Sequence, residues 1–200
     1  MSSSAARAWR FTDGSGLTRT LDRRIDMHVV LLQPSDATQY RQLMLEACEL
    51  AADAFTSTVE ERAAEPETYW VKRSADPKGM GAAFGAFEGQ RLVGTVALEY
   101  SAKPKTRHKA LVIGMYVTPQ ARRSGTGRAL LEAAELHAKS KHGIVSLTLT
   151  VTEGNESAIT LYRTAGFEIF GTEPMAIHTP TGYKAKVYMW LPLSHAHTAV

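Results

Sequence analysis

The residues best suited to chemistry lie between a buried strand and a helix, in the stretch VIGMYVTPQARRSGTG over residues 112–127. The strand is expected to end at Pro119, and the loop after it opens directly into a helix. Glycines let a backbone approach a ligand closely, and the first N–H groups of a helix lack internal partners at the positive end of its dipole. The loop is therefore predicted to bind a phosphate or pyrophosphate through backbone amides, with Arg122, Arg123 and Arg128 adding positive charge.

Two familiar kinds of phosphate-binding loop do not fit this stretch. A Walker A loop needs Gly-Lys-Ser/Thr, whereas Gly127 is followed by Arg128 and Ala129. A dinucleotide-binding loop needs a third glycine or alanine where Leu130 stands, and it follows the first strand of a β-α-β unit. Here helices and a hairpin precede the loop, so another kind of anion-binding loop is required.

The elements that position the loop follow from apolar periodicity and from cap and turn residues. Strands are expected over residues 27–32, 82–87, 91–100, 110–117, 144–151, 167–172 and 183–191. One helix follows Pro34, Ser35 and Asp36, with an apolar face comprising Tyr40, Leu43, Met44, Ala47, Leu50, Ala51 and Ala54. A second opens at a capping box formed by Ser57 and Thr58 with Glu60 and Glu61 and is interrupted by Pro66. Two more are expected over residues 124–141 and 155–165.

The order of these elements predicts a single α/β domain over residues 27–200. Hairpins combined with one β-α-β crossover give a mixed sheet with helices on both faces. The chain has 200 residues, of which 44% are hydrophobic and 22% charged, and this balance is ordinary for one packed domain. Residues 1–26, with serines, arginines and few acids, are interpreted as a flexible or irregular N-terminal extension.

The charge of the chain suits a phosphate-bearing ligand without requiring nucleic acid. The net charge is +3 and the sequence pI is about 9.0, a mild and dispersed basic excess. The basic run Lys103, Lys105, Arg107, His108 and Lys109 lacks interleaved aromatic residues, so it is interpreted as a solvated loop. No nucleic-acid partner is therefore expected.

The single cysteine, Cys48, allows no internal disulfide and falls on an apolar helix position, so it is interpreted as a core residue. This usage fits a reducing compartment, and a cytoplasmic location is expected. No apolar run approaches the roughly 20 residues of a membrane span, so no membrane association is expected.

The loop at residues 122–127 resembles the one found in the GNAT superfamily of acetyl-CoA-dependent N-acetyltransferases. Those proteins carry Gln/Arg-x-x-Gly-x-Gly/Ala between their fourth strand and the following helix. This chain has Arg122-x-x-Gly125-x-Gly127 at that place.

A second motif strengthens the resemblance. In GNAT proteins the loop and its helix are followed by a strand, an Asn, a short helix with a Tyr, and a Gly-Phe that begins the next strand. Here these are residues 144–151, Asn155, Tyr162 and Gly166–Phe167. The resemblance covers about residues 27–193, with the specific motifs confined to 115–167.

The resemblance implies a three-layer fold of about seven mostly antiparallel strands, which splay apart between strands four and five. It implies transfer of an acetyl group from acetyl-CoA to a primary amine of a small molecule or peptide, by direct attack in a ternary complex. The resemblance implies no metal, and the expectation of a homodimer is taken from the superfamily alone. The alternative is a non-catalytic acyl-CoA-binding module with a regulatory role, which would keep the loop but would not need Tyr162.

The resemblance also implies residue roles. Backbone groups of Met115 and Val117 pair with the pantetheine amides like an added strand, and the amides of residues 123–128 hold the pyrophosphate. The full set implied to bind the cofactor is Met115, Tyr116, Val117, Arg122, Arg123, Ser124, Gly125, Thr126, Gly127, Arg128, Asn155, Ser157 and Tyr162.

Tyr162 is implied to be the general acid. Attack on the thioester expels a thiolate whose conjugate acid resembles cysteine, with a pKa of ~8.5, and a phenol with a pKa of ~10 can protonate it. Helical spacing alone equally places Tyr162 on an apolar face with Ala158, Ile159, Leu161 and Ala165.

The amine also requires a base, because an alkylamine is mostly protonated at neutral pH. Glu99, Glu153 and His108 are candidates, although each taken alone fits a solvated surface group better. The resemblance assigns the acceptor pocket to residues 55–70 and to a loop at 173–182.

In the first of those regions Phe55, Tyr69 and Trp70 could wall an acceptor pocket or belong to the core. The mild positive charge argues against a polyamine acceptor, which would need an acidic cleft.

Overall fold

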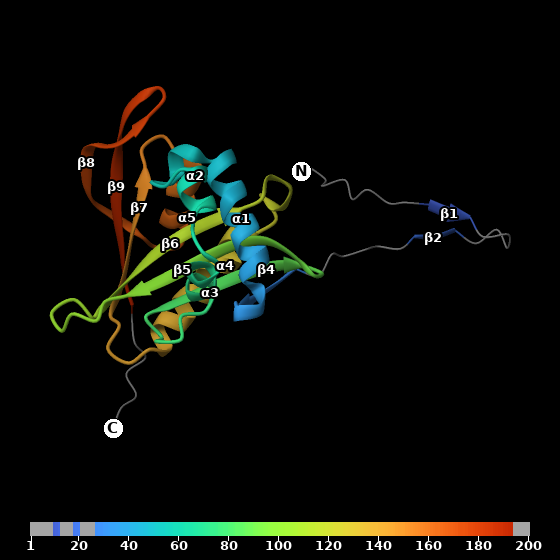
Figure 1. The fold of residues 1–200 in the computed structure, drawn as a ribbon, viewed down its shortest axis with the longest axis horizontal. Coiled ribbons are helices and arrows are strands. Elements are labelled where there is room, and N and C mark those ends of the chain that lie inside the picture. Colours follow the sequence, from blue (N-terminus) through green and yellow to red (C-terminus); the bar gives the residue numbers. More distant parts are fainter. Residues whose placement is uncertain (1–9, 13–17, 21–26, 194–200) are drawn as a thin grey trace.

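The computed structural model describes residues 10–12, 18–20 and 27–193 (Figure 1). Its main sheet has the order β3-β4-β5-β6-β7-β9-β8. The strands are β3 (Met27–Leu31), β4 (Gly81–Glu88), β5 (Arg91–Tyr100), β6 (Lys109–Val117), β7 (Ser146–Thr152), β8 (Glu168–Thr179) and β9 (Gly182–Pro192). In this sheet β6 and β7 run parallel and every other neighbouring pair is antiparallel, which confirms the predicted fold class.

A separate two-stranded antiparallel sheet is formed by β1 (Arg10–Thr12) and β2 (Thr18–Thr20). The rest of the predicted extension over residues 1–26 lies outside the described residues.

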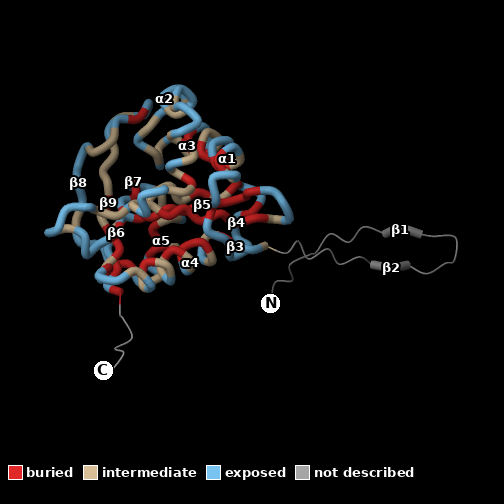
Figure 2. The backbone as a smooth tube through the Cα atoms, turned by 60° about the horizontal axis from the view of Figure 1, so that its bottom comes forward, coloured by how far each residue is buried: buried red, intermediate tan, exposed pale blue. Residues whose placement is uncertain are grey.

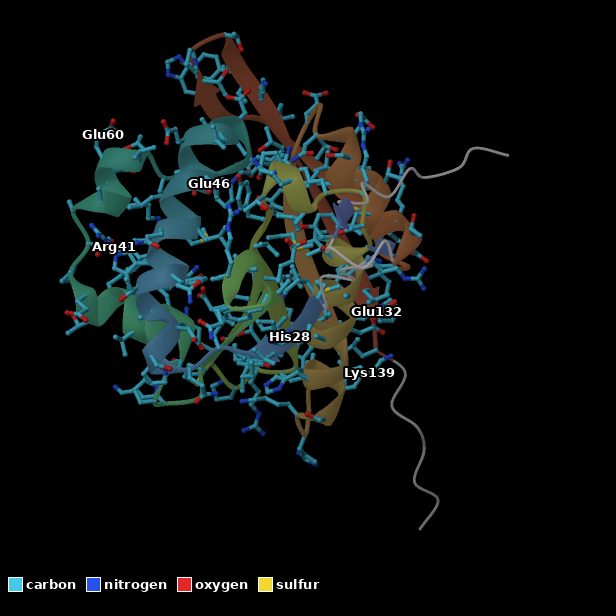
Figure 3. The ribbon with its side chains drawn as sticks, turned by 90° about the vertical axis from the view of Figure 1, so that its right-hand side faces the viewer. His28, Arg41, Glu46, Glu60, Glu132 and Lys139 are labelled. Carbon is cyan, nitrogen blue, oxygen red and sulfur yellow. The ribbon has the colours of Figure 1, made fainter. Side chains whose placement is uncertain are left out.

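Helices cover both faces of the main sheet (Figure 1). The helices are α1 (Ala37–Leu50), α2 (Val59–Ala63), α3 (Glu67–Ser74), α4 (Thr126–Ser140) and α5 (Glu156–Thr164). Figure 3 shows Arg41 and Glu46 of α1 on one side of the sheet and Glu132 and Lys139 of α4 on the other. Among the described residues, no helix combines the length and apolarity needed to cross a membrane.

Two hydrophobic clusters hold the layers together, one on each face of the central strands. On one face Leu130 and Ala134 of α4 pack with residues of β5 and β7, and on the other Tyr40 and Ala47 of α1 pack with Trp70 and β4. Figure 2 shows buried residues concentrated along the central strands, and they include most of β4 and β5. Cys48 is buried, as predicted for a core residue.

Cap and turn residues in the sequence predicted where most helices begin, but two expectations about helices need correction. The capping box is confirmed, with Thr58 as N-cap and reciprocal bonds to Glu61 of 2.9 and 3.2 Å. Leu50, expected on the inner face of the first helix, is 59% exposed, because α1 ends there and a 3₁₀ turn, η2 (Ala52–Ala54), redirects the chain. Pro66 does not simply interrupt a helix; it is the N-cap of a further one, α3.

The region expected as a loop at residues 173–182 is mostly strand. β8 continues to Thr179, with an irregularity in its pairing between Glu173 and Ile177 and a positive φ of 53° at Met175. Because β8 is the edge strand of the sheet, Pro174 costs no ladder hydrogen bond on the open side, so a proline there does not end the strand.

Two strand glycines give a direct test of packing. A Cβ on Gly85 of β4 would lie 2.5 Å from Leu32 Cδ2 and 2.6 Å from Leu92 Cδ1, both in the core, whereas a Cβ on Gly171 of β8 would meet nothing within 4 Å. Gly85→Ala is expected to destabilise the protein by about 1–3 kcal/mol through overpacking, and Gly171→Ala by less than about 0.5 kcal/mol. Urea unfolding midpoints measure both, and equal midpoints would contradict the packing of β4 against β3 and β5.

Candidate active site

The site begins where β6 and β7 separate. The two strands pair only from Lys109↔Ser146 to Leu111↔Thr148, although both continue for several residues. In the pairing with β5, Ala97 faces Ile113 and Thr95 faces Tyr116, so two residues of β6 oppose one of β5. The extra residue is accommodated at Gly114, whose φ of 61° suits glycine, and such a bulge bends its strand. The predicted splay between the fourth and fifth strands of the sheet is thereby confirmed.

A cavity of about 210 Å³ lies in this splay and reaches both faces of the sheet. We call it the splay cavity. Of the residues predicted for the site, Phe55, Met115, Asn155 and Tyr162 line it. A donor that enters from one face and an acceptor that enters from the other would meet there.

Tyr162 reaches the splay cavity from the buried side of α5. Its side chain is 5% exposed, and its ring packs edge-on against Phe167 with centroids 5.8 Å apart. Tyr162 lines the splay cavity, and among the described residues no side-chain hydrogen bond of its hydroxyl is found. Burial raises the pKa of Tyr162, so the group stays protonated at neutral pH and can act only as a hydrogen-bond or proton donor.

The glycine-containing loop leaves a row of free backbone donors at the start of α4. Gly125 is the N-cap in a left-handed conformation with φ of 89°, and Arg123 also has a positive φ, of 62°. The first helical bond runs from Ala129 N to Gly125 O, and within the described chain none of the six amides of residues 123–128 has a hydrogen-bond partner. The Ser124 hydroxyl donates to Ala121 O at 2.8 Å and fixes the loop. Such a nest of amides at a helix N-terminus fits an anion.

The loop arginines do not all face that nest. The Arg122 Nε donates to Val117 O at 3.0 Å, and its guanidinium lies 5.8 Å from the centroid of the Tyr116 ring. Arg128 forms an ion pair with Glu132 at 2.7 Å. Arg123 has no side-chain partner among the described residues, so the backbone and Arg123 contribute most of the uncompensated positive potential.

Tyr116, predicted in the cofactor set, directs its side chain to the α1 face instead. Its hydroxyl donates to Glu46 Oε1 at 3.0 Å and ties the end of α1 to β6. Burial and the neighbouring Glu46 carboxylate raise the pKa of Tyr116 to about 12. Only the backbone of Tyr116 is left for a ligand in the splay.

Asn155 and Ser157 shape the start of α5. The Asn155 Oδ1 accepts hydrogen bonds from Ala158 N at 3.3 Å and from the Ser157 hydroxyl at 3.1 Å. The acceptor atom of Asn155 is therefore used as an N-cap, and its side-chain NH₂ is the group left for a ligand.

The candidate bases lie outside the splay cavity. Glu99 lines a neighbouring hollow of about 340 Å³, where it lies 3.7 Å from Arg73. Glu153 lines another hollow of about 520 Å³ that shares Asn155 with the splay cavity. His108 is exposed just before β6, at the end where β6 still pairs with β7.

The three aromatic candidates for the acceptor pocket have separate positions. Phe55 lines the splay cavity and Tyr69 is half-buried at the hollow beside Glu99. Trp70 is 2% exposed and packs edge-on against Tyr40 and Tyr69, so it belongs to the core.

Three cationic residues at the splay cavity were missed by sequence reasoning: Arg62, Arg73 and Lys186. Arg62 and Arg73 come from the short helices α2 and α3, and Lys186 comes from β9. No motif or periodicity marks them, because the fold brings β9 beside two short helices that are distant from it in sequence.

The Tyr116–Glu46 contact predicts a pH-dependent stability. Tyr116→Phe is expected to cost roughly 1–3 kcal/mol at pH 7, because it removes a hydrogen bond to a carboxylate. The folded-state pKa of about 12 lies above the ordinary value of 10.0, so the contribution is complete below pH 10 and is lost as the pH rises toward 12. The difference between wild type and variant should therefore shrink over that range in urea titrations.

Tyr100→Phe is the matched control, since burial also raises the pKa of Tyr100 to about 12 but its buried hydroxyl has no partner among the described residues. That variant should lose less than about 0.5 kcal/mol at pH 7. A Tyr116→Phe protein as stable as wild type, or a difference that widens above pH 10, would contradict the contact.

Comparisons with known proteins agree with this geometry. The chain is 37% identical over 101 residues to mycothiol acetyltransferase of Rhodococcus jostii, which covers 49% of this chain and 32% of that protein. It is 34% identical over 86 residues to the ribosomal protein bS18-alanine N-acetyltransferase of Escherichia coli, which covers 43% of this chain and 57% of that protein. The chain thus spans between a third and three fifths of these relatives.

Among solved structures, the fold matches a GNAT superfamily phosphinothricin acetyltransferase from Sinorhizobium meliloti in complex with acetyl-CoA. The TM-score is 0.73 at 18% identity, over 87% of this chain and 92% of that one. The model of the acetyltransferase (GNAT) family matches residues 44–167, more than half of the chain. The chain therefore belongs to the GNAT family of acetyltransferases.

Proposed function

We propose that this protein is an N-acetyltransferase that moves an acetyl group from acetyl-CoA to a primary amine, by direct attack in a ternary complex. The observation that carries the proposal is the row of six free amides at the start of α4, beside a splay cavity that contains Tyr162. The names of the two sequence relatives support acetyl transfer, and they leave the acceptor open between a small molecule and a protein amine.

The residues present fit acetyl-CoA in two independent respects. The amides of residues 123–128 would hold the diphosphate, since a helix N-terminus with free donors favours an anion. The edge of β6 beyond Leu111 has no strand partner on the β7 side, so its backbone groups near Met115 can pair with the amides of the pantetheine arm. When bound, acetyl-CoA supplies a thioester, an activated acetyl group with a thiolate leaving group.

The protein's own groups manage the protons of this transfer. The amine nitrogen forms a bond to the acetyl carbon as the carbon–sulfur bond breaks, and the departing sulfur takes a proton from the Tyr162 hydroxyl. The proton lost by the nitrogen passes to water, and Tyr162 regains one from solvent. Within the part of the chain that the structure describes, no carboxylate and no histidine lines the splay cavity. Glu99 and Glu153, in the adjoining hollows, remain the two proposed acceptors at the end of a water path.

The alternative, a non-catalytic acyl-CoA-binding module, would also use the loop of residues 122–128. A buried phenol with an unused hydroxyl on the cavity wall has a role in transfer and none in binding alone. Tyr162 therefore favours the enzyme.

Gly125→Glu tests the placement of the diphosphate. The substitution puts bulk and negative charge at the centre of the nest, so acetyl-CoA affinity is expected to fall by about 100-fold or more in calorimetry. Gly125→Ala is the control, because it carries the strain of a left-handed φ of 89° without the charge, and no atom lies within 4 Å of its Cβ. Unchanged affinity in Gly125→Glu, or equal losses in both variants, would place the diphosphate elsewhere.

Tyr162→Phe tests the general acid. The variant keeps the ring and its packing on Phe167, so acetyl-CoA affinity and folding should persist while kcat falls by roughly 10²–10⁴-fold. Release of free thiol from acetyl-CoA with an amine panel measures turnover. Wild-type turnover in this variant would remove Tyr162 from the mechanism and would restore the binding-module alternative.

A further inference from the structure

The acceptor side of the splay cavity is cationic. Arg62, Arg73 and Lys186 line the cavity, and none of the described residues around it is an aspartate or glutamate. Placing three cations around one small cavity is unfavourable unless an anion joins them. The partners of the two arginines show how much of this charge is left for a ligand.

Neither arginine is fully neutralised by the described residues. Arg62 donates from Nη1 to the Tyr69 hydroxyl, and its guanidinium lies 5.3 Å from the centroid of the same ring, so its partner is a neutral phenol. Arg73 lies 3.7 Å from Glu99, whose side chain is 57% exposed. That single long contact is weak, and a guanidinium has five N–H donors, so most of the donors of Arg73 remain available.

A third donor lies beside them. The hydroxyl of Tyr40, a residue 1% exposed on α1, is buried without a hydrogen-bond partner among the described residues. It lies 3.8 Å from the position that a Cβ on Gly114 would occupy, at the bulge that lines the cavity. Burial raises the pKa of Tyr40, while the charge of Arg73, hydrogen bonding from the Arg73 side chain and the charge of Arg62 oppose that rise. A hydroxyl that accepts from Arg73 still has its own proton to donate to a ligand.

We propose that the acceptor is an amine that also carries a carboxylate, and that Arg62, Arg73 and the Tyr40 hydroxyl hold this carboxylate at the splay cavity. This inference rests on the proposed acetyl transfer. Guanidinium groups bind carboxylates through paired charge-assisted hydrogen bonds, and a buried phenol without a partner gains one from the same ligand. The cavity of about 210 Å³ suits a small acceptor, such as an amino acid or the N-terminal end of an acidic peptide.

The experiment compares amines that differ only in the carboxylate. The first arm pairs L-alanine, L-phenylalanine and L-glutamate with their α-amides, and the second pairs the peptide amide Ala-Glu-Gly-NH₂ with Ala-Gln-Gly-NH₂. Acetylation rates with acetyl-CoA are expressed per concentration of free amine, because amidation lowers the pKa of the amine. The carboxylate member of at least one pair should have a kcat/KM about tenfold or more above its neutral partner. A preference in the first arm identifies an α-carboxylate, and a preference in the second arm identifies an acidic side chain.

Variants assign the effect to the arginines. Arg73→Gln and Arg62→Gln should raise KM for the carboxylate amine by about tenfold and leave its neutral partner and acetyl-CoA affinity unchanged. Arg91→Gln is the control, since Arg91 is exposed at the start of β5 and carries the same charge away from the cavity. Binding of the N-acetylated carboxylate product, measured by calorimetry with free CoA present, should weaken in the two cavity variants only.

The outcomes separate this inference from the function it rests on. Amides acetylated as well as acids, or arginine variants that slow both members of a pair equally, would overturn the carboxylate site while acetyl transfer stands. If no amine in either arm is acetylated and acetyl-CoA does not bind, the proposed function fails, and the carboxylate acceptor fails with it.

Discussion

The site depends on the early end of hydrogen bonding between β6 and β7. Three residue pairs hold these parallel strands together, and beyond Leu111 and Thr148 they separate. The gap can persist because each strand is satisfied on its other edge: β7 pairs with β9 from Ser146 to Thr152, and β6 pairs with β5 through the bulge at Gly114. Helices pack on both faces, so the separated ends are fixed by two hydrophobic cores rather than by each other. Backbone polar groups along the gap are then exposed to a ligand, and an extended molecule with amide groups can complete the missing pairing.

The two faces of the gap differ in how they provide charge. On the α4 side, positive potential comes mainly from backbone amides, since Arg122 and Arg128 are engaged with protein groups. On the side of α1 to α3 it comes from side chains, and the described residues that line the splay cavity include no carboxylate. If the proposed amine binds there, nearby cations would disfavour its protonated form, so its pKa would be lowered and less would be required of a base. In the proposed transfer Tyr162, which is buried and neutral, would supply a proton at the same place without adding charge of either sign.

The sequence predicted the local geometry of the loop before α4 and of α5 well, because that geometry is encoded locally. A glycine that must adopt a positive φ, a helix that must begin with free amides and a tyrosine seven residues after its N-cap Asn155 are all visible as spacings within one segment. The missed features depend on contacts between distant segments. Arg62, Arg73 and Lys186 meet only when α2, α3 and β9 are assembled, and the turn after Leu50 and the extension of β8 past Pro174 depend on packing and on edge position.

The same distinction explains why family membership identifies the donor more firmly than the acceptor. The family model matches residues 44–167, which contain the loop, the splay and Tyr162. Tyr40 and Lys186 lie outside that range, and the proposed acceptor side is assembled from them together with two short helices. Backbone geometry around a diphosphate tolerates many side chains provided the glycines are kept, so such a site is recognisable over large sequence distances. An acceptor pocket made of side chains can change its charge with two or three substitutions without disturbing the splay. The charge of this pocket must therefore be derived from the side chains of this chain, and those side chains are cationic.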